Sequence, residues 1–167
     1  TYSPEGAQLA TGSLDGTVKL WDARTGRELT AFNAHSSGVE RVIFTADGHG
    51  LITSGRDDAV RFWHKGTQAQ VTETSLGRQT PEDFVLARRS WDGRLVAAGS
   101  SDGTLLLLDG RSLARLGTWR SRGRNWDLCW TRDDQRLITS SSRGGMHGQD
   151  RGSVESWSVR DLREVLT

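Results

Sequence analysis

A histidine, a carboxylate and a hydroxyl, the residue types of a nucleophilic triad, occur in this sequence as His35, Asp57 and Thr53. Such a set can transfer an acyl group if the hydroxyl faces a substrate and the histidine accepts its proton. The direction in which Thr53 points therefore decides between a catalytic and a structural role, and that direction depends on the elements that carry these residues.

Other patterns that resemble reactive sites are weaker. The glycine-rich run at 142–148 (SRGGMHG) lacks the Lys-Ser/Thr ending of a phosphate-binding loop. The four histidines have no metal-ligand spacing, and the single cysteine cannot complete a Cys/His zinc set. Two Asp-Asp pairs, at 57–58 and 133–134, fall where hairpin turns are expected, and turns favour Asp. We therefore expect no enzymatic activity, no metal and no cofactor.

A hairpin pattern recurs along the chain. In its first copy, at 11–22 (TGSLDGTVKLWD), an Asp-Gly turn separates two β-prone runs, because Gly accepts the positive φ of a tight turn. Copies at 53–64 and 98–109 keep the turn Asp six residues before a tryptophan position, whereas a fourth, at 152–158, lacks the turn. The tryptophan positions lie 42, 45 and 49 residues apart and hold Trp21, Trp63, Leu108 and Trp157. A period in the forties with strand patterning predicts a repeat fold.

Trp21-Asp22, with the hairpin before it, resembles a WD40 repeat. About four such repeats cover nearly the whole chain, approximately at 1–34, 35–77, 78–119 and 120–167. The resemblance implies an all-β fold, a β-propeller built of four-stranded antiparallel blades. Four repeats are fewer than such propellers usually have, so we expect a partial, open arc with a strand edge exposed at each end. The sequence starts mid-element without an initiator methionine, so further blades are expected in a longer, full-length chain.

Each repeat is expected to supply an inner strand, a second strand, a third strand that carries the tryptophan position, and an outer strand. The inner strands begin near Val39, Phe84 and Trp126. The second strands are expected at 8–13, 50–54, 94–99 and 135–141, and the third strands at 17–21, 59–63, 104–108 and 153–157.

Repeats of the WD40 family share a buried hydrogen-bond chain from the tryptophan, through a hydroxyl on the second strand, to a histidine and the turn Asp. The resemblance assigns this structural network to His35, Thr53, Asp57 and Trp63 in the second repeat, and to Thr11, Asp15 and Trp21 in the first. Thr53 is then expected to point into the sheet, away from any substrate. Pairing is required because each polar group left unpaired after burial costs about 1–3 kcal/mol. The third repeat lacks the tryptophan, and the fourth has Arg151 in the Asp position, so the network is expected to be incomplete there.

Composition limits the remaining possibilities. The 167 residues can bury one core, and a net charge of +1 gives no general attraction to nucleic acids or membranes. No apolar run approaches the roughly 18 residues that span a bilayer. One cysteine excludes an intramolecular disulfide, and its place in the run WDLCW predicts a buried strand thiol at Cys129. We expect a reducing, cytoplasmic location.

Arginine concentrates in two loops of the last repeats. The fourth repeat carries an insertion of about eight residues near 143–150, and the loop at 119–126 (WRSRGRNW) precedes it. The resemblance implies that both lie on the face of the propeller that binds partners. The candidate partner-binding residues are Arg56, Arg120, Arg122, Arg124, Trp126, Arg143, His147 and Arg151. Since Arg binds carboxylate and phosphate bidentately, we expect an acidic or phosphorylated protein or peptide as partner.

The alternative is that these arginines are solvated loop residues, partly offset by Glu82 and Asp83. Nucleic acid is less favoured, because the basic patch is small and lacks a binding motif. At the level of function, the sequence predicts a non-catalytic protein-protein interaction scaffold. The alternative is a regulatory or sensing propeller attached to a catalytic domain, a kinase or a signalling NTPase, outside this chain.

Overall fold

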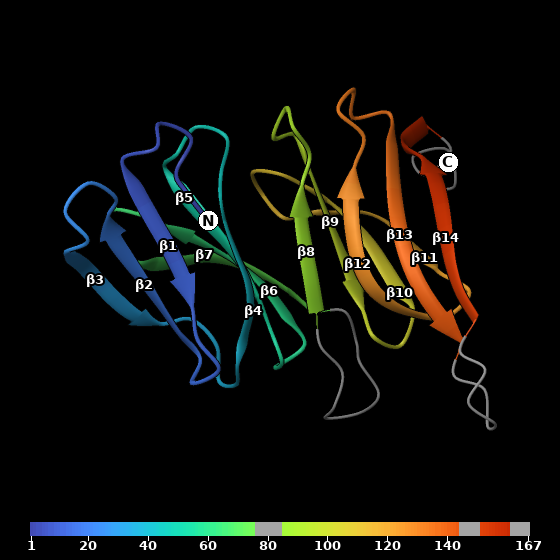
Figure 1. Cartoon of the computed structure of the whole chain (residues 1–167), viewed down its shortest axis with the longest axis horizontal. Coiled ribbons are helices and arrows are strands. Elements are labelled where there is room, and N and C mark those ends of the chain that lie inside the picture. Colours follow the sequence, from blue (N-terminus) through green and yellow to red (C-terminus); the bar gives the residue numbers. More distant parts are fainter. Residues whose placement is uncertain (76–84, 144–150, 161–167) are drawn as a thin grey trace.

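The structure, a computed structural model, describes residues 1–75, 85–143 and 151–160. In these residues the chain forms four antiparallel sheets, which lie side by side in an open arc (Figure 1). We call each sheet a blade and number the blades along the chain. The arrangement confirms the expected partial β-propeller, with one blade for each hairpin pattern in the sequence.

The first two blades follow the predicted strand order. The first has the order β1 (Gln8–Gly12), β2 (Thr17–Asp22) and β3 (Glu28–Asn33). The second has the order β4 (Val39–Phe44), β5 (Gly50–Gly55), β6 (Ala59–His64) and β7 (Ala69–Ser75). On the inner side of β1 only a short bridge between Tyr2 and Leu9 is present, whereas β5 has the whole of β4 there.

The third blade repeats the four-stranded plan, and the described residues of the fourth form its inner, second and third strands. The third has the order β8 (Val85–Arg89), β9 (Leu95–Ser100), β10 (Thr104–Asp109) and β11 (Arg115–Arg120). The fourth has the order β12 (Arg124–Trp130), β13 (Arg136–Arg143) and β14 (Arg151–Ser158). The inner strands β4, β8 and β12 therefore come from three successive blades and lie next to one another along the arc (Figure 1).

The hairpin turns have the backbone that the sequence pattern requires. Gly16 and Gly103, which follow the turn Asp in the first and third blades, have φ angles of 88° and 93°. In the second blade Asp58 takes the same place with a φ of 66°. Asp is one of the few side chains that tolerate this conformation, so an Asp-Asp pair can replace Asp-Gly.

Apolar side chains fill the space between neighbouring blades. One cluster joins the first and second blades through residues such as Leu20 and Trp63. The next joins the second and third through Ile52 and Leu108, and the last joins the third and fourth through Leu107, with Trp157 packed at its margin. Successive residues of one strand enter different clusters, as Leu107 and Leu108 do, because successive side chains point to opposite faces of a sheet. In the second, third and fourth blades the residue at the tryptophan position faces the preceding blade.

Cys129 corrects one expectation. It is exposed rather than buried. Its neighbours Leu128 and Trp130 point toward the third blade, so Cys129 points to the opposite face of β12. Val154 shares that face and is 75% exposed, because no described residue packs over it. The flanking apolar residues in the sequence indicated a buried strand but not which face of it lies on a neighbouring blade.

Candidate functional site

A chain of hydrogen bonds crosses the second blade. The indole N–H of Trp63 donates to Oγ1 of Thr53 over 2.9 Å, and this oxygen lies 2.7 Å from Nε2 of His35. The other ring nitrogen, Nδ1, lies 2.7 Å from Oδ1 of Asp57. Since the indole can only donate and an ionised carboxylate can only accept, the Thr53 hydroxyl donates to Nε2, and Nδ1 carries the imidazole proton. A neutral His35 thus satisfies every member of the chain.

Burial and hydrogen bonding set the protonation of the two ionisable groups. The His35 side chain is fully buried, which lowers its pKa despite the nearby carboxylate of Asp57. Burial acts to raise the pKa of Asp57, but hydrogen bonds from His35 and Arg61 outweigh it and lower that pKa to about 2. At neutral pH the pair is therefore a neutral imidazole and an ionised carboxylate.

Backbone contacts with the first blade hold His35 in place. The N–H groups of Ala34 and His35 donate to the carbonyl oxygen of Gly16 over 2.9 and 3.1 Å. On the other side of the ring, a Cβ added at Gly55 would lie 2.4 Å from Nδ1 of His35. Glycine at this position leaves the space that the imidazole occupies, so the strand β5 can pass directly beside the ring.

Arg61 joins this network, although no motif in the sequence pointed to it. Its Nη1 donates to Oδ2 of Asp57 over 2.7 Å, and its Nε donates to Glu73 over 2.7 Å. The same Nη1 lies 2.6 Å from Nδ1 of His35, but that nitrogen already carries a proton, so this is a close approach of two donors. The register of the hairpin was a signal for it, because Arg61 of β6 lies directly opposite Thr53 of β5.

This arrangement does not expose a nucleophile. Thr53 is fully buried, its oxygen already bonds both Trp63 and His35, and no substrate atom can approach it. A nucleophile must lie within reach of the group that it attacks. The resemblance to a triad therefore stops at the residue types, and the geometry is that of a satisfied buried network.

The first and fourth blades contain shorter versions of the network. In the first blade the indole of Trp21 donates to Oγ1 of Thr11 over 2.9 Å in an exposed position. Asp15 accepts from the N–H of Thr17 over 2.8 Å and so stabilises its own turn. The fourth blade keeps the bond from the indole of Trp157 to Thr139, at 3.1 Å, although the sequence placed no Asp at its turn.

Two of the candidate partner-binding arginines line one groove. Arg120 and Arg122 lie beside Val154, Glu155, Ser156 and Trp157 of β14 around a hollow of about 450 Å³. Arg120 pairs with Asp102 over 3.2 Å, and Nε of Arg122 lies 3.4 Å from Glu155. The side chains of the two arginines remain 65% and 75% exposed, so both guanidinium groups also face the solvent.

The remaining candidates are dispersed. Arg124 opens β12, and Trp126, which is 53% exposed, donates its indole N–H to Ser142 over 2.7 Å. Arg56 lies on the second blade and pairs with Glu40. The backbones of Arg143 and Arg151 pair where β13 and β14 meet, and His147 lies outside the described residues.

Comparison with known proteins identifies the repeat. A family model described as "WD domain, G-beta repeat" matches residues 1–22 and 26–64. These residues contain the first blade, the inner three strands of the second and the complete network of His35, Thr53, Asp57 and Trp63. The matched residues are WD40 repeats. The third and fourth blades repeat the same strand plan beyond the residues that the family model matches.

Several curated WD40 relatives align with this chain. It is 36% identical over 103 residues to periodic tryptophan protein 2 of Arabidopsis thaliana, and this alignment covers 61% of this chain and 11% of that protein. It is 33% identical over 104 residues to autophagy-related protein 16 of the same plant, with 62% and 20% covered. The pre-rRNA-processing protein IPI3 of Mycosarcoma maydis is 32% identical over 136 residues, with 70% and 23% covered. The chain thus spans less than a quarter of the length of each of these relatives.

A solved structure supports the fold. The chain superposes on the structure of U3-55K with a TM-score of 0.78 and 15% sequence identity, over 97% of this chain and 48% of that one. At this identity the likeness concerns the WD40 fold alone. Within the described ranges no group of three or more His, Cys, Asp or Glu side chains could hold a metal ion. No described helix is long and apolar enough to cross a membrane.

Proposed function

We propose that this WD40 chain is a non-catalytic scaffold that binds an acidic or phosphorylated peptide in the groove between β11 and β14. The observation that carries the proposal is the hollow of about 450 Å³ in which two exposed guanidinium groups, of Arg120 and Arg122, lie beside Trp157 of β14. Such a groove offers charge-assisted hydrogen bonds to an oxyanion and apolar surface to the residue beside it.

The acidic neighbours of these arginines favour a ligand with more than one negative charge. Asp102 and Glu155 already accept from Arg120 and Arg122, so a ligand must compete with them. A phosphate group carries close to two charges at neutral pH and presents three acceptor oxygens. Each guanidinium has five N–H donors, which allows it to keep its carboxylate while binding a second acceptor.

The wider setting of the protein is part of the same proposal. The names of the relatives mention autophagy and pre-rRNA processing, and these different processes support interaction as the shared role rather than one process. We propose the cytoplasm as the location, with the single cysteine, which has no partner for an intramolecular disulfide in this sequence, as its support.

The test is peptide binding by the full-length protein. Fluorescent peptides with one phosphoserine or a run of glutamates are titrated by anisotropy, next to neutral peptides of the same length. We expect Arg120→Glu/Arg122→Glu to weaken binding of the charged peptides by at least about tenfold, since two charge-assisted contacts become repulsive. Arg94→Glu is the matched control, because Arg94 is 84% exposed and belongs to another turn. Binding that the double variant leaves unchanged, or no preference for charged peptides, would overturn the proposal.

A further inference from the structure

His35 is a buried titratable group that the proposed peptide groove does not use. It belongs to the loop 34–38, which connects β3 of the first blade to β4 of the second. The side chain of His35 is fully buried, whereas the next two residues, Ser36 and Ser37, are exposed. A short loop at the seam between two blades is thus held in part by one ionisable side chain.

The hydrogen bonds at Nε2 of His35 leave no place for a second proton on the ring. Nε2 accepts from the hydroxyl of Thr53, and the oxygen of this hydroxyl also accepts from the indole of Trp63. If Nε2 carried a proton, the Thr53 oxygen would face two donors, and its own proton would lose its acceptor. This side of the ring therefore requires a neutral imidazole.

Charged groups on the other side of the ring act in opposite directions. Burial is the largest effect and lowers the pKa of His35 below its ordinary value of 6.5. Asp57, which lies 2.7 Å from Nδ1, favours a protonated ring, whereas Arg61, 2.6 Å from the same nitrogen, opposes it. Glu73 of β7 pairs with Arg61 and weakly favours the proton. Because the pKa of Asp57 is about 2, this carboxylate stays ionised in mildly acidic solution.

Other charged side chains on the surrounding elements have partners of their own. Asp15, in the facing turn of the first blade, is exposed and accepts hydrogen bonds within that turn. Glu40 of β4 and Arg56 of the turn after β5 pair with each other over 2.5 Å. Asp58 of the same turn accepts from Ser75 of β7. The proton balance of the histidine is therefore governed by the three charged groups beside its ring.

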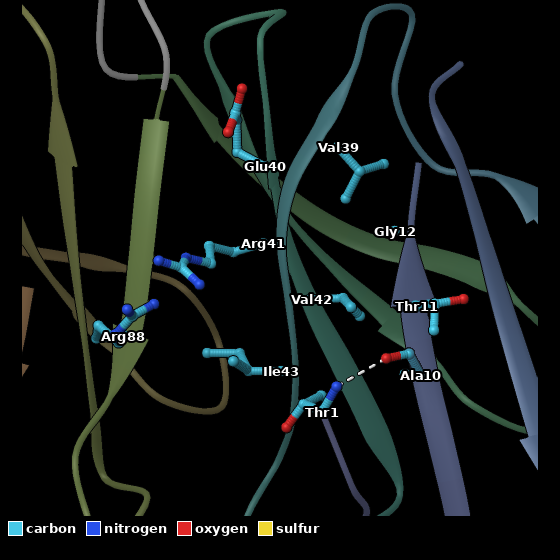
Figure 2. Close-up of a pocket in the computed structure, with 10 residues that line it drawn as sticks. All are labelled: Thr1, Ala10, Thr11, Gly12, Val39, Glu40, Arg41, Val42, Ile43 and Arg88. Carbon is cyan, nitrogen blue, oxygen red and sulfur yellow. Dashed lines mark hydrogen bonds between the residues drawn. The ribbon is translucent and has the colours of Figure 1, made fainter. Parts of the chain in front are cut away.

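The two ends of the loop are fixed independently of the histidine ring. At one end Asn33 pairs with Thr17 in the sheet of the first blade. At the other end the N–H of Val39 donates to the carbonyl oxygen of Ser13 over 2.9 Å. Val39 also packs on Gly12, where an added Cβ would lie 2.5 Å from Cγ1 of Val39, and Figure 2 shows the two residues side by side. The loop can therefore open while the strands that it connects stay paired.

We propose that the loop 34–38 is an acid-sensitive element, which opens locally when the His35 imidazole accepts a proton from the solvent. The imidazolium leaves its place beside Thr53 and is hydrated. The N–H groups of the loop then lose their acceptors, the carbonyl oxygen of Gly16 and the carboxylate of Asp57. The opening loosens the seam between the first two blades without unfolding either of them.

The experiment measures hydrogen exchange of the full-length protein between pH 7 and pH 5. Protection is calculated against unstructured peptides, which removes the intrinsic pH dependence of exchange. We expect the protection of the N–H groups of Ala34, His35 and Ser36 to fall by about tenfold for each pH unit below 6.5, since opening takes up one proton. Low concentrations of urea should leave this protection unchanged, because a local opening exposes little surface, whereas the protection of β5 and β6 should fall.

His35→Gln removes the titratable group and should abolish the pH dependence of loop protection. His64→Gln is the matched control, because His64 is an exposed histidine at the end of β6, and it should leave the pH profile unchanged. The proposal is wrong if loop protection does not depend on pH, if His35→Gln keeps the dependence, or if urea lowers the protection of loop and strands alike. The unmodified protein suffices for the first and third of these outcomes, even if His35→Gln does not fold.

Discussion

Thr53→Val removes one oxygen atom from the centre of the buried network and keeps the shape and β-branching of the side chain. The indole N–H of Trp63 then lacks its acceptor, and Nε2 of His35 lacks its donor. His35 and Thr53 are fully buried and Trp63 is 6% exposed, so water cannot replace the hydroxyl without opening the blade. Two unsatisfied groups at about 1–3 kcal/mol each, less the gain from burying a methyl group, give an expected loss of about 2–4 kcal/mol.

The first blade offers a matched control for this substitution. Thr11→Val removes the same indole contact, at the same distance of 2.9 Å, from a site that is exposed and has no histidine. Water can satisfy Trp21 there, so the expected loss is below about 1 kcal/mol. The free energy of unfolding is measured by urea titration of both variants, with circular dichroism and tryptophan fluorescence as probes. Equal losses in the two variants would refute the reasoning that burial and the histidine connection make the difference.

Two further outcomes are expected from the same network. The ionised Asp57 stabilises the folded state by about 2 kcal/mol; this contribution is complete above its ordinary pKa of 3.8 and is lost as the pH falls toward about 2. Because the pKa of His35 is lowered in the folded state, a further loss of stability begins below pH 6.5. Unfolding should therefore become easier from pH 7 to pH 3, and Asp57→Asn should flatten this dependence below pH 4; an unchanged slope would contradict it. Gly55→Ala places a Cβ 2.4 Å from Nδ1 of His35 and should cost about 1–3 kcal/mol in urea titrations, whereas Gly152→Ala, with no atom within 4 Å of its Cβ, should be neutral.

The strand plan could be predicted from the sequence because each repeat contains its own local evidence. The Asp-Gly turns at Gly16 and Gly103 require positive φ, and the fixed distance from the turn to Trp21 or Trp63 defines the hairpin that follows. These features depend on neighbours along the chain. The resemblance built on them therefore led to the correct fold class even where Leu108 replaces the tryptophan.

The features that the sequence did not reveal depend on contacts between repeats. Cys129 lies between two buried residues of its strand, yet the face on which it lies has no described blade against it. Arg41, Arg88 and Asp127 form an ion-pair cluster, although they are far apart along the chain and occupy strands without a shared motif. They meet only because inner strands of successive blades converge, and two bulges shift the register just before Arg41 and Asp127. Neither convergence nor bulges follow from composition or periodicity.

The packing between blades gives the arc a direction. At each described interface, the face of one blade that carries the tryptophan position packs against the face of the preceding blade that lacks it. Trp63 packs in this way against the first blade and Trp157 against the third. Each blade therefore has two kinds of face, one with the tryptophan position and one without it, and the two kinds are complementary. Duplication of a repeat would add a blade with the same two kinds of face. The number of blades in such a protein can thus change by gene duplication without the evolution of a new interface.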